Sequence, residues 1–119
     1  MPTKIRDQER LSKKNKMDVE TVGNFVKVFE ILGSKTRLKI LRIISSEGKC
    51  VNFISKKLKL SQPTISYHLK LLWDFDLVKQ QKTAQWVRYS LNKEKLAELL
   101  TDFLKIYKIL KHGEGKKKE

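Results

Sequence analysis

One short stretch, LSQPTISYHLKLL over residues 60–72, most constrains what this chain can fold into, because a polar, turn-forming start runs directly into a helical pattern. Ser61 can cap a helix, since its hydroxyl can accept a hydrogen bond from a free backbone N–H, and Pro63 is tolerated in a first turn. Three apolar residues recur at helical spacing on one face: Ile65, Leu69 and Leu72. Three other residues fall near the opposite face: Thr64, Tyr67 and Lys70. The pattern predicts a helix that packs on one side and leaves the other side free for a partner.

A shorter amphipathic helix is predicted just before this one, in CVNFISKKLKL over residues 50–60. Its apolar positions are Val51, Ile54 and Leu58. Its lysines lie on the outside: Lys56, Lys57 and Lys59. The short turn KLS separates the two helices, and a turn of this length is typical of a helix-turn-helix.

Helical patterns also occupy residues 18–32 and 34–47. The first pattern ends at Gly33 and carries a broad apolar stripe: Val19, Val22, Phe25, Val26, Phe29 and Leu32. The second pattern can be capped by Ser34 and stops at Gly48. Four of its residues are expected to face the core: Leu38, Ile40, Leu41 and Ile44.

A β-hairpin and a last helix are predicted after the helix-turn-helix. Residues 77–91 hold a β-prone run, a short polar loop and a second run in which apolar residues alternate, so we expect a wing with Lys82 and Gln85 near its tip. Asn92 can cap the last helix, which is expected to end at Gly113. Its apolar residues recur at helical intervals: Leu96, Leu99, Leu100, Phe103, Tyr107 and Leu110.

These elements predict a mainly α fold with a small β-hairpin, a winged helix-turn-helix with additional N- and C-terminal dimerisation helices over residues 18–111. The length allows one domain. Residues 1–17 are expected to form a basic flexible arm, and residues 112–119 a flexible basic tail. The wide apolar stripes of the first and last helices exceed what one small core would use, which favours pairing with a second copy.

The charge of the chain favours a nucleic-acid partner. Its 119 residues include 27 Lys and Arg against 13 Asp and Glu, a formal net charge of +14, and such a surplus favours binding to a polyanion. A helix-turn-helix places its second helix in the major groove, so double-stranded DNA is the expected partner. No apolar run approaches the ~20 residues of a membrane span, and the start lacks the hydrophobic segment of a signal peptide. We therefore expect a cytoplasmic protein with no membrane partner.

The candidate DNA-binding residues follow from this placement. Gln62, Thr64 and Tyr67 are expected to meet base edges, because Gln suits bidentate pairing with adenine and Thr can hydrogen-bond or meet a thymine methyl group. Lys70 and Arg88 are expected to meet the DNA backbone. The full predicted set is Ser61, Gln62, Thr64, Tyr67, His68, Lys70, Lys82, Gln85 and Arg88.

Several short motifs occur together in a recognisable order and spacing. They are Thr36-Arg37-Leu38, Leu60-Ser61-Gln62-Pro63 with Ser66, His68 and Leu69, Leu77-Val78, and Trp86-Val87 with Tyr89. Over roughly residues 20–108 they resemble the arsenic-repressor (ArsR/SmtB) family of dimeric winged-helix transcriptional regulators. The resemblance implies a homodimer built mainly from the two terminal helices, which binds an imperfect inverted repeat and represses transcription until an effector arrives.

The chain departs from the family pattern at two turn positions. Asp76 stands where the family usually has Gly before the first wing strand, and Asp can still visit a left-handed conformation. Ala84 stands where the wing turn usually has Gly. Because Ala accepts positive φ poorly, the turn type of the hairpin stays open.

The family's metal sites are also altered. Some members bind metal through a cysteine cluster in the first helix of the helix-turn-helix, where this chain has Cys50 but then Asn52 and Ser55. One soft ligand cannot close a thiolate site. Other members use carboxylates and histidines of the terminal helices, where this chain has Glu98 and Asp102 without a nearby histidine. We expect no metal site and no other cofactor, and the effector stays unknown.

The sequence also bears on enzyme activity and on a few individual residues. We expect no enzyme activity, because two separated histidines, one cysteine and no glycine-rich phosphate loop offer no catalytic set. A sequence-tolerant architectural or DNA-coating protein is the alternative to a sequence-specific regulator. Cys50 is either a small buried apolar residue or a thiol switch, and His68 is either structural or a phosphate contact. Trp73 and Trp86 are expected to be core or hairpin cover.

Overall fold

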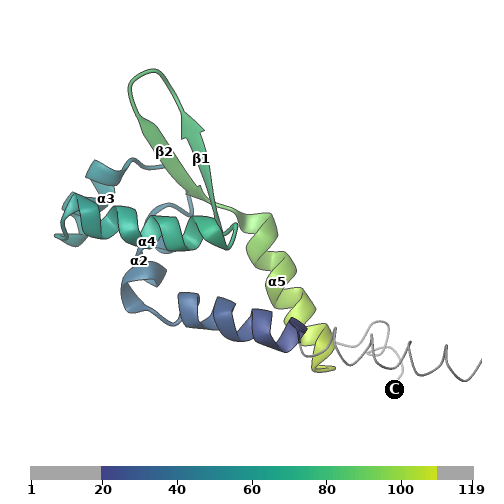
Figure 1. Cartoon of the computed structure of the whole chain (residues 1–119). Coiled ribbons are helices and arrows are strands. Elements are labelled where there is room, and N and C mark those ends of the chain that lie inside the picture. The colour runs from purple at the N-terminus through teal and green to yellow at the C-terminus, as the bar shows by residue number, and fades with distance from the viewer. Residues whose placement is uncertain (1–19, 110–119) are drawn as a thin grey trace, which may run out of the picture.

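The computed structural model describes residues 20–109 and places them in the predicted element order. A helix over residues 20–32 is followed by α2 (Lys35–Ile43), α3 (Val51–Leu58), α4 (Gln62–Asp74), β1 (Val78–Lys82), β2 (Val87–Leu91) and α5 (Lys93–Ile106). The strands pair in antiparallel fashion, and Figure 1 shows the hairpin projecting away from the helices. The mainly α fold with one small hairpin is confirmed. The predicted arm and tail lie outside the described residues.

Polar caps begin three helices at the predicted residues. The Ser34 and Ser61 hydroxyls and the Asn92 amide oxygen each accept the backbone N–H three residues ahead, at 3.2 Å. A cap of this kind is worth about 1 kcal/mol. Asn92 is also buried and donates its amide N–H to the Asp76 carbonyl at 2.9 Å. That bond fixes the start of α5 to the end of α4.

α2 ends at Ile43, earlier than the predicted stop at Gly48. At this end the Leu91 N–H donates to the Ile44 carbonyl at 3.2 Å, and further on Lys49 and Tyr89 exchange two hydrogen bonds of 2.9 and 2.8 Å. This pairing adds a short third segment to the base of the wing. It joins parts of the chain that are far apart in sequence, so helical periodicity could not reveal it.

α3, α4 and α5 each end on a left-handed residue that is not glycine. The residues are Lys59, Asp76 and Lys108, with φ of 59°, 62° and 58°. After each one, the next N–H donates to the carbonyl five positions back, at 3.1, 2.9 and 2.8 Å, which is the Schellman arrangement of a helix end. Asp76 therefore adopts the left-handed conformation that an aspartate tolerates. The third motif ends α5 at Ile106, well before the predicted end at Gly113.

The core lies between the helix-turn-helix and β1. Its buried side chains form one cluster: Ile31, Ile40, Leu41, Ile44, Ile54, Ile65, Leu69, Leu72, Leu77 and Val78. The predicted inner faces of α3 and α4 are therefore confirmed. The prediction for Leu38 is wrong, because its side chain is 52% exposed. It faces a space between α2 and α5 instead of the core.

The helix over residues 20–32 packs against α5 through aromatic side chains. Phe103 meets Phe25 and Phe29 edge to face, with ring centroids 5.3 and 4.9 Å apart. The inward side of this helix consists of Phe25, Val28 and Ile31, whereas Val22, Val26 and Phe29 are exposed. α5 contributes no fully buried residue. Among residues 20–109, neither these helices nor any other is long and apolar enough to cross a membrane.

Candidate nucleic-acid interface

The nine predicted DNA-binding residues fall on two neighbouring elements, α4 and the hairpin (Figure 1). Six lie at or along α4: Ser61, Gln62, Thr64, Tyr67, His68 and Lys70. Three lie on the hairpin: Lys82, Gln85 and Arg88. Thr64 and His68 are half-buried, and the other seven are exposed. The fold therefore leaves these side chains on the surface, as a DNA contact requires.

The turn between α3 and α4 is held by local hydrogen bonds. The Leu60 N–H donates to the Ser55 carbonyl at 3.1 Å, and the Ser55 hydroxyl donates to the Leu60 carbonyl. Lys59 takes the left-handed conformation between them. The predicted three-residue turn is thus present, and its conformation sets the angle at which α4 leaves α3.

The Ser61 hydroxyl is used to cap the start of α4. Its hydroxyl accepts the Thr64 N–H at 3.2 Å and donates to the Thr64 hydroxyl oxygen at 2.8 Å. Because a hydroxyl has a single proton, Ser61 has no donor left for DNA. Thr64 keeps its own proton, so of these two hydroxyls only that of Thr64 can donate to DNA.

Gln62 is held by a residue that the sequence interpretation assigned no role in DNA binding. Its amide nitrogen donates to the side-chain oxygen of Asn52 in α3, at 3.0 Å. A glutamine amide has two N–H groups and one oxygen. One N–H and the oxygen therefore stay free in a fixed plane, which is the pair that an adenine edge requires. No spacing rule links the two residues, because they meet only across the turn.

His68 is contacted by Arg37 of α2, a residue that the sequence did not point to as part of the DNA-binding set. Nη1 of Arg37 lies 3.0 Å from Nδ1 of His68. Burial lowers the pKa of His68, and the Arg37 charge lowers it further. Tyr67, the neighbouring residue, is 60% exposed and meets the His68 ring edge to face at 5.3 Å.

Lys70 is exposed and has one acidic neighbour. Its ammonium lies 3.5 Å from the Asp74 carboxylate, one helical turn later. An exposed pair of this kind contributes less than ~1 kcal/mol. Lys70 can therefore exchange Asp74 for a DNA phosphate at little cost.

The hairpin loop closes without any left-handed residue. The Thr83 hydroxyl accepts the N–H groups of Gln85 and Trp86 at 3.3 and 3.1 Å, and the Thr83 N–H donates to the Trp86 carbonyl at 2.9 Å. Ala84 has no positive φ. The hairpin turn therefore does not need a glycine at position 84. The side-chain and backbone hydrogen bonds of Thr83 close it instead.

Two aromatic residues are more exposed than predicted. Trp86 is 38% exposed, and the Arg88 guanidinium lies 4.0 Å from the centre of its ring. Stacking on an aromatic face orients an arginine without neutralising it. Trp73 is 46% exposed on α4. Neither residue is in the core. Trp73 lines a small hollow with Gln80 and Tyr89, which agrees with the hairpin-cover alternative, and Trp86 stacks with Arg88 on the wing.

The residues around Cys50 do not fit a soft metal ion. Cys50 is the half-buried N-cap of α3, and the next two positions of the family's cysteine cluster carry oxygen ligands that are already engaged. The Asn52 oxygen accepts Gln62, and the Ser55 hydroxyl donates to Leu60. Within residues 20–109, no three His, Cys, Asp or Glu side chains gather as metal ligands.

Comparisons with known proteins agree with this geometry. The family model "Bacterial regulatory protein, arsR family" matches residues 34–80. The cadmium resistance transcriptional regulatory protein CadC homolog of Staphylococcus aureus is 36% identical over 96 residues, covering 80% of this chain and 74% of that protein. The arsenical resistance operon repressor of Bacillus subtilis is 33% identical over 97 residues, covering 81% and 91%.

A solved structure supports the fold. The homodimeric winged helix-turn-helix DNA-binding domain of Mb0332 from Mycobacterium bovis, a possible ArsR-family transcriptional regulator, aligns with a TM-score of 0.62 and 18% identity. The alignment covers 79% of this chain and 88% of that one. The relatives and the matched family are DNA-binding transcriptional regulators, not enzymes. The motifs, the winged helix-turn-helix and these relatives together place the chain in the ArsR family of bacterial regulatory proteins.

Proposed function

We propose that this protein is a sequence-specific repressor that binds an inverted repeat in double-stranded DNA as a homodimer. The observation that carries the proposal is the Gln62 amide, which is exposed at the start of α4 and held by Asn52 at 3.0 Å. A fixed amide at the major-groove end of a recognition helix serves base reading, since an adenine edge needs a donor and an acceptor in one plane. A protein that only coats DNA needs charge, not an oriented amide.

The other predicted residues take complementary roles. Thr64 and Tyr67 lie in the first and second turns of α4 and are assigned to base edges. Lys70, Lys82 and Arg88 are exposed cations that are assigned to phosphates. Phosphate contacts fix the position of a protein on the duplex, whereas base contacts carry the sequence information.

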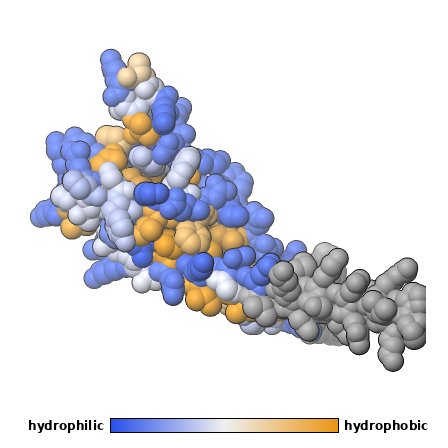
Figure 2. Space-filling view, viewed as in Figure 1, coloured by the Kyte–Doolittle hydropathy of each residue, from blue (hydrophilic) through white to orange (hydrophobic). Residues whose placement is uncertain are grey.

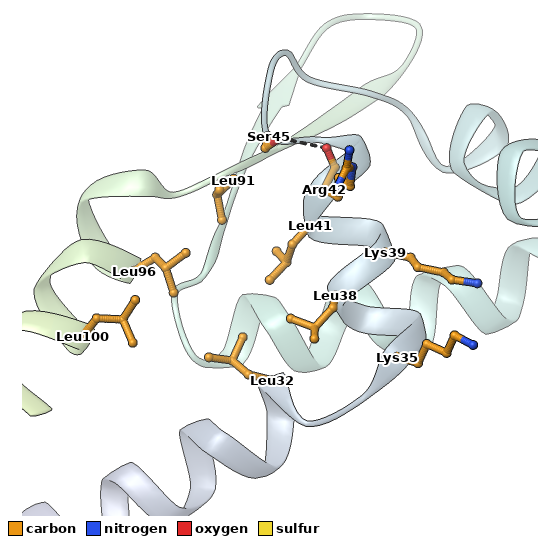
Figure 3. A pocket seen from close by; sticks show the side chains of 10 residues that line it. All are labelled: Leu32, Lys35, Leu38, Lys39, Leu41, Arg42, Ser45, Leu91, Leu96 and Leu100. Atoms are coloured by element: carbon orange, nitrogen blue, oxygen red, sulfur yellow. Dashed lines mark hydrogen bonds between the residues drawn. The ribbon is translucent and has the colours of Figure 1, made fainter.

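An apolar groove between α2 and α5 supports the homodimer. Figure 3 shows leucine side chains around the groove, whereas Lys35 and Lys39 point away from it. The groove has a volume of about 650 Å³ and six leucines in its lining: Leu32, Leu38, Leu41, Leu91, Leu96 and Leu100. The terminal helices carry further exposed apolar residues at their other ends: Val22, Val26, Phe29, Ile106 and Tyr107. Figure 2 shows hydrophobic side chains gathered on this lower part of the molecule.

We call this combined surface the terminal-helix face and assign it to a second copy of the chain. Contiguous apolar surface of this kind marks an interaction site, and the related Mb0332 domain is homodimeric. A two-fold axis through the face would place two α4 helices about one DNA turn apart, roughly 34 Å, and so match an inverted repeat.

Control by a bound metal ion is not part of the proposal. The family's soft-metal position offers one thiol beside two engaged oxygen groups, and thiolate sites for such ions need more sulfur ligands. Titrating zinc, cadmium and arsenite into the protein–DNA complex, with a chelator control, tests this point. Reversible release of DNA at one metal per subunit would contradict it.

Selection from a random DNA pool at ~0.15–0.2 M salt tests the whole proposal, because non-specific binding weakens steeply with salt while base readout survives better. An enriched inverted repeat, and reduced transcription from a promoter that carries it, are the expected results. A flat pool would favour the coating protein, which the net charge of the chain would also serve. Increased transcription would indicate an activator.

A further inference from the structure

One guanidinium group connects three elements of this fold. Nε of Arg37, in the first turn of α2, donates to the Ile31 carbonyl at 2.7 Å. Ile31 lies at the end of the helix over residues 20–32, where carbonyls have no partner within the helix. Nη1 of Arg37 lies 3.0 Å from Nδ1 of His68 in α4. Arg37 thus ties the end of a terminal helix to the recognition helix.

The Arg37 contact determines which His68 nitrogen carries the proton. A guanidinium can only donate hydrogen bonds, so Nδ1 of His68 must be the acceptor. The ring is then neutral and carries its proton on Nε2. Burial and the Arg37 charge both lower the pKa of His68 and so support the neutral form. Within residues 20–109, Nε2 has no hydrogen-bond partner.

His68 is also placed on the DNA side of α4. It lies one helical turn after Thr64, so the two side chains share a face of the helix. It is half-buried and flanked by the exposed ring of Tyr67. Its free donor is therefore at the edge of the surface assigned to DNA.

We propose that Arg37 is a positioning residue for DNA binding, which presents His68 as a neutral ring whose Nε2–H donates to a phosphate oxygen of the operator. This inference rests on the proposed function, because it needs α4 to lie against DNA. It makes His68 a phosphate contact that adds no charge to the interface. Arg37 itself stays behind the recognition helix and touches no DNA.

The first test needs no DNA. Nitrogen NMR of the free protein at pH 7 reports the tautomer of each ring, and the chain has only two histidines, His68 and His112. The expected result is a neutral His68 with its proton on Nε2. In Arg37→Met this preference should disappear, whereas Arg42→Met, a matched change on the same helix, should leave it intact. A proton on Nδ1 in the unchanged protein would overturn the proposal.

The second test separates the two nitrogens of His68 by substitution. His68→Asn keeps an acceptor for Arg37 near the place of Nδ1 but has no donor that reaches the phosphate. His68→Gln loses the acceptor and keeps an N–H near the place of Nε2. We expect His68→Asn to weaken binding to the selected repeat about 10- to 100-fold, because it loses a hydrogen bond to a charged group. The affinity of His68→Gln should stay within about threefold of that of the unchanged protein. Equal affinity of His68→Asn and the unchanged protein would overturn the proposal.

Salt dependence provides a readout that a purely structural role would not produce. A neutral donor displaces no counterion, so the slope of log affinity against log salt should be the same in His68→Asn and the unchanged protein. Lys82→Met, a lost phosphate cation, should reduce that slope by about 1 per site. A changed slope in His68→Asn would show a charged imidazole and refute the neutral donor.

A last pair of variants covers the case in which Arg37→Met fails to fold. Arg37→Lys keeps the charge but offers one nitrogen where Arg37 uses two, Nε for the Ile31 carbonyl and Nη1 for His68, so it should reproduce the tautomer change and weaken DNA binding. Added to His68→Asn, Arg37→Lys should cause no further loss of DNA affinity. If Arg37→Lys weakened binding as much there as in the unchanged protein, Arg37 would not act through His68. If selection yields no repeat while the tautomer is as expected, the proposed function fails but the Arg37 geometry stands.

Discussion

Replacing Asn52 should weaken recognition of the operator although Asn52 is not expected to touch DNA. Asn52 accepts the Gln62 amide at 3.0 Å, so the free protein already holds Gln62 in one orientation. An unrestrained glutamine loses up to ~1.5–2 kcal/mol of side-chain entropy when it is fixed, and a net hydrogen bond is worth roughly 0.5–1.5 kcal/mol. In Asn52→Ala the Gln62 side chain is free before binding, so the entropy of fixing it is lost when the protein binds DNA.

We expect Asn52→Ala to cost about 0.5–1.5 kcal/mol per half-site, which for two half-sites is roughly a 5- to 150-fold loss of affinity. Binding to random DNA should change less than about twofold, because an amide carries no charge and releases no counterions. Fluorescence anisotropy at one fixed salt concentration, on the selected repeat and on a scrambled duplex, measures both. Gln62→Ala should cost roughly 1–3 kcal/mol on the selected repeat.

A double-mutant cycle distinguishes orientation from direct contact. If Asn52 acts only through Gln62, then Asn52→Ala adds nothing in a Gln62→Ala background. The same loss in both backgrounds would show that Asn52 meets DNA itself and would refute the reasoning. An equal loss on the scrambled duplex would remove the base-reading role altogether.

Three further outcomes follow from the structure. Asp76→Gly should leave the free energy of unfolding nearly unchanged while Asp76→Val lowers it by about 1–2 kcal/mol, because φ is 62° there; equal urea curves would contradict this. Leu38→Glu should convert the protein to a 14 kDa monomer by light scattering, whereas Phe53→Glu, which lies outside the groove, should leave the dimer mass unchanged. The pKa of His68 is lowered in the folded chain. The neutral ring therefore contributes fully to stability above the unfolded pKa of about 6.5, and this contribution is lost as the pH falls through the lower pKa of the folded state. His68→Gln should flatten the decline in urea stability between pH 7 and 5, and an unaltered decline would exclude His68 as its source.

Local signals in the sequence predicted much of this fold, because their physics involves only near neighbours. The caps at Ser34, Ser61 and Asn92 each need one side chain and the N–H three residues ahead. The inner faces of α3 and α4 follow from apolar spacing alone. The outer face of α4 follows from the same spacing, which placed Thr64, Tyr67 and Lys70 opposite the core side of the helix.

Contacts between distant segments could not be predicted in this way. Asn52 and Arg37 meet their partners only after α3, α2 and α4 have packed, and no periodicity encodes those meetings. Leu38 illustrates a second limit. Its spacing matches that of Leu41, yet Leu41 is buried and Leu38 is exposed. Apolar spacing alone does not distinguish a residue that packs in the core from one that stays on the surface.

The distribution of buried residues links folding to DNA binding. The core cluster draws its residues from the helix-turn-helix, β1, α2 and the single Ile31 of the first helix, and α5 supplies no fully buried residue. The terminal helices therefore leave several apolar side chains exposed in the single chain. If the dimer covers that surface, stability rises with protein concentration by mass action. In the proposed dimer, the two recognition helices would be paired as an inverted repeat requires. One association step would then complete both the hydrophobic packing and the DNA-binding geometry, so protein concentration alone can set operator occupancy even without a bound effector.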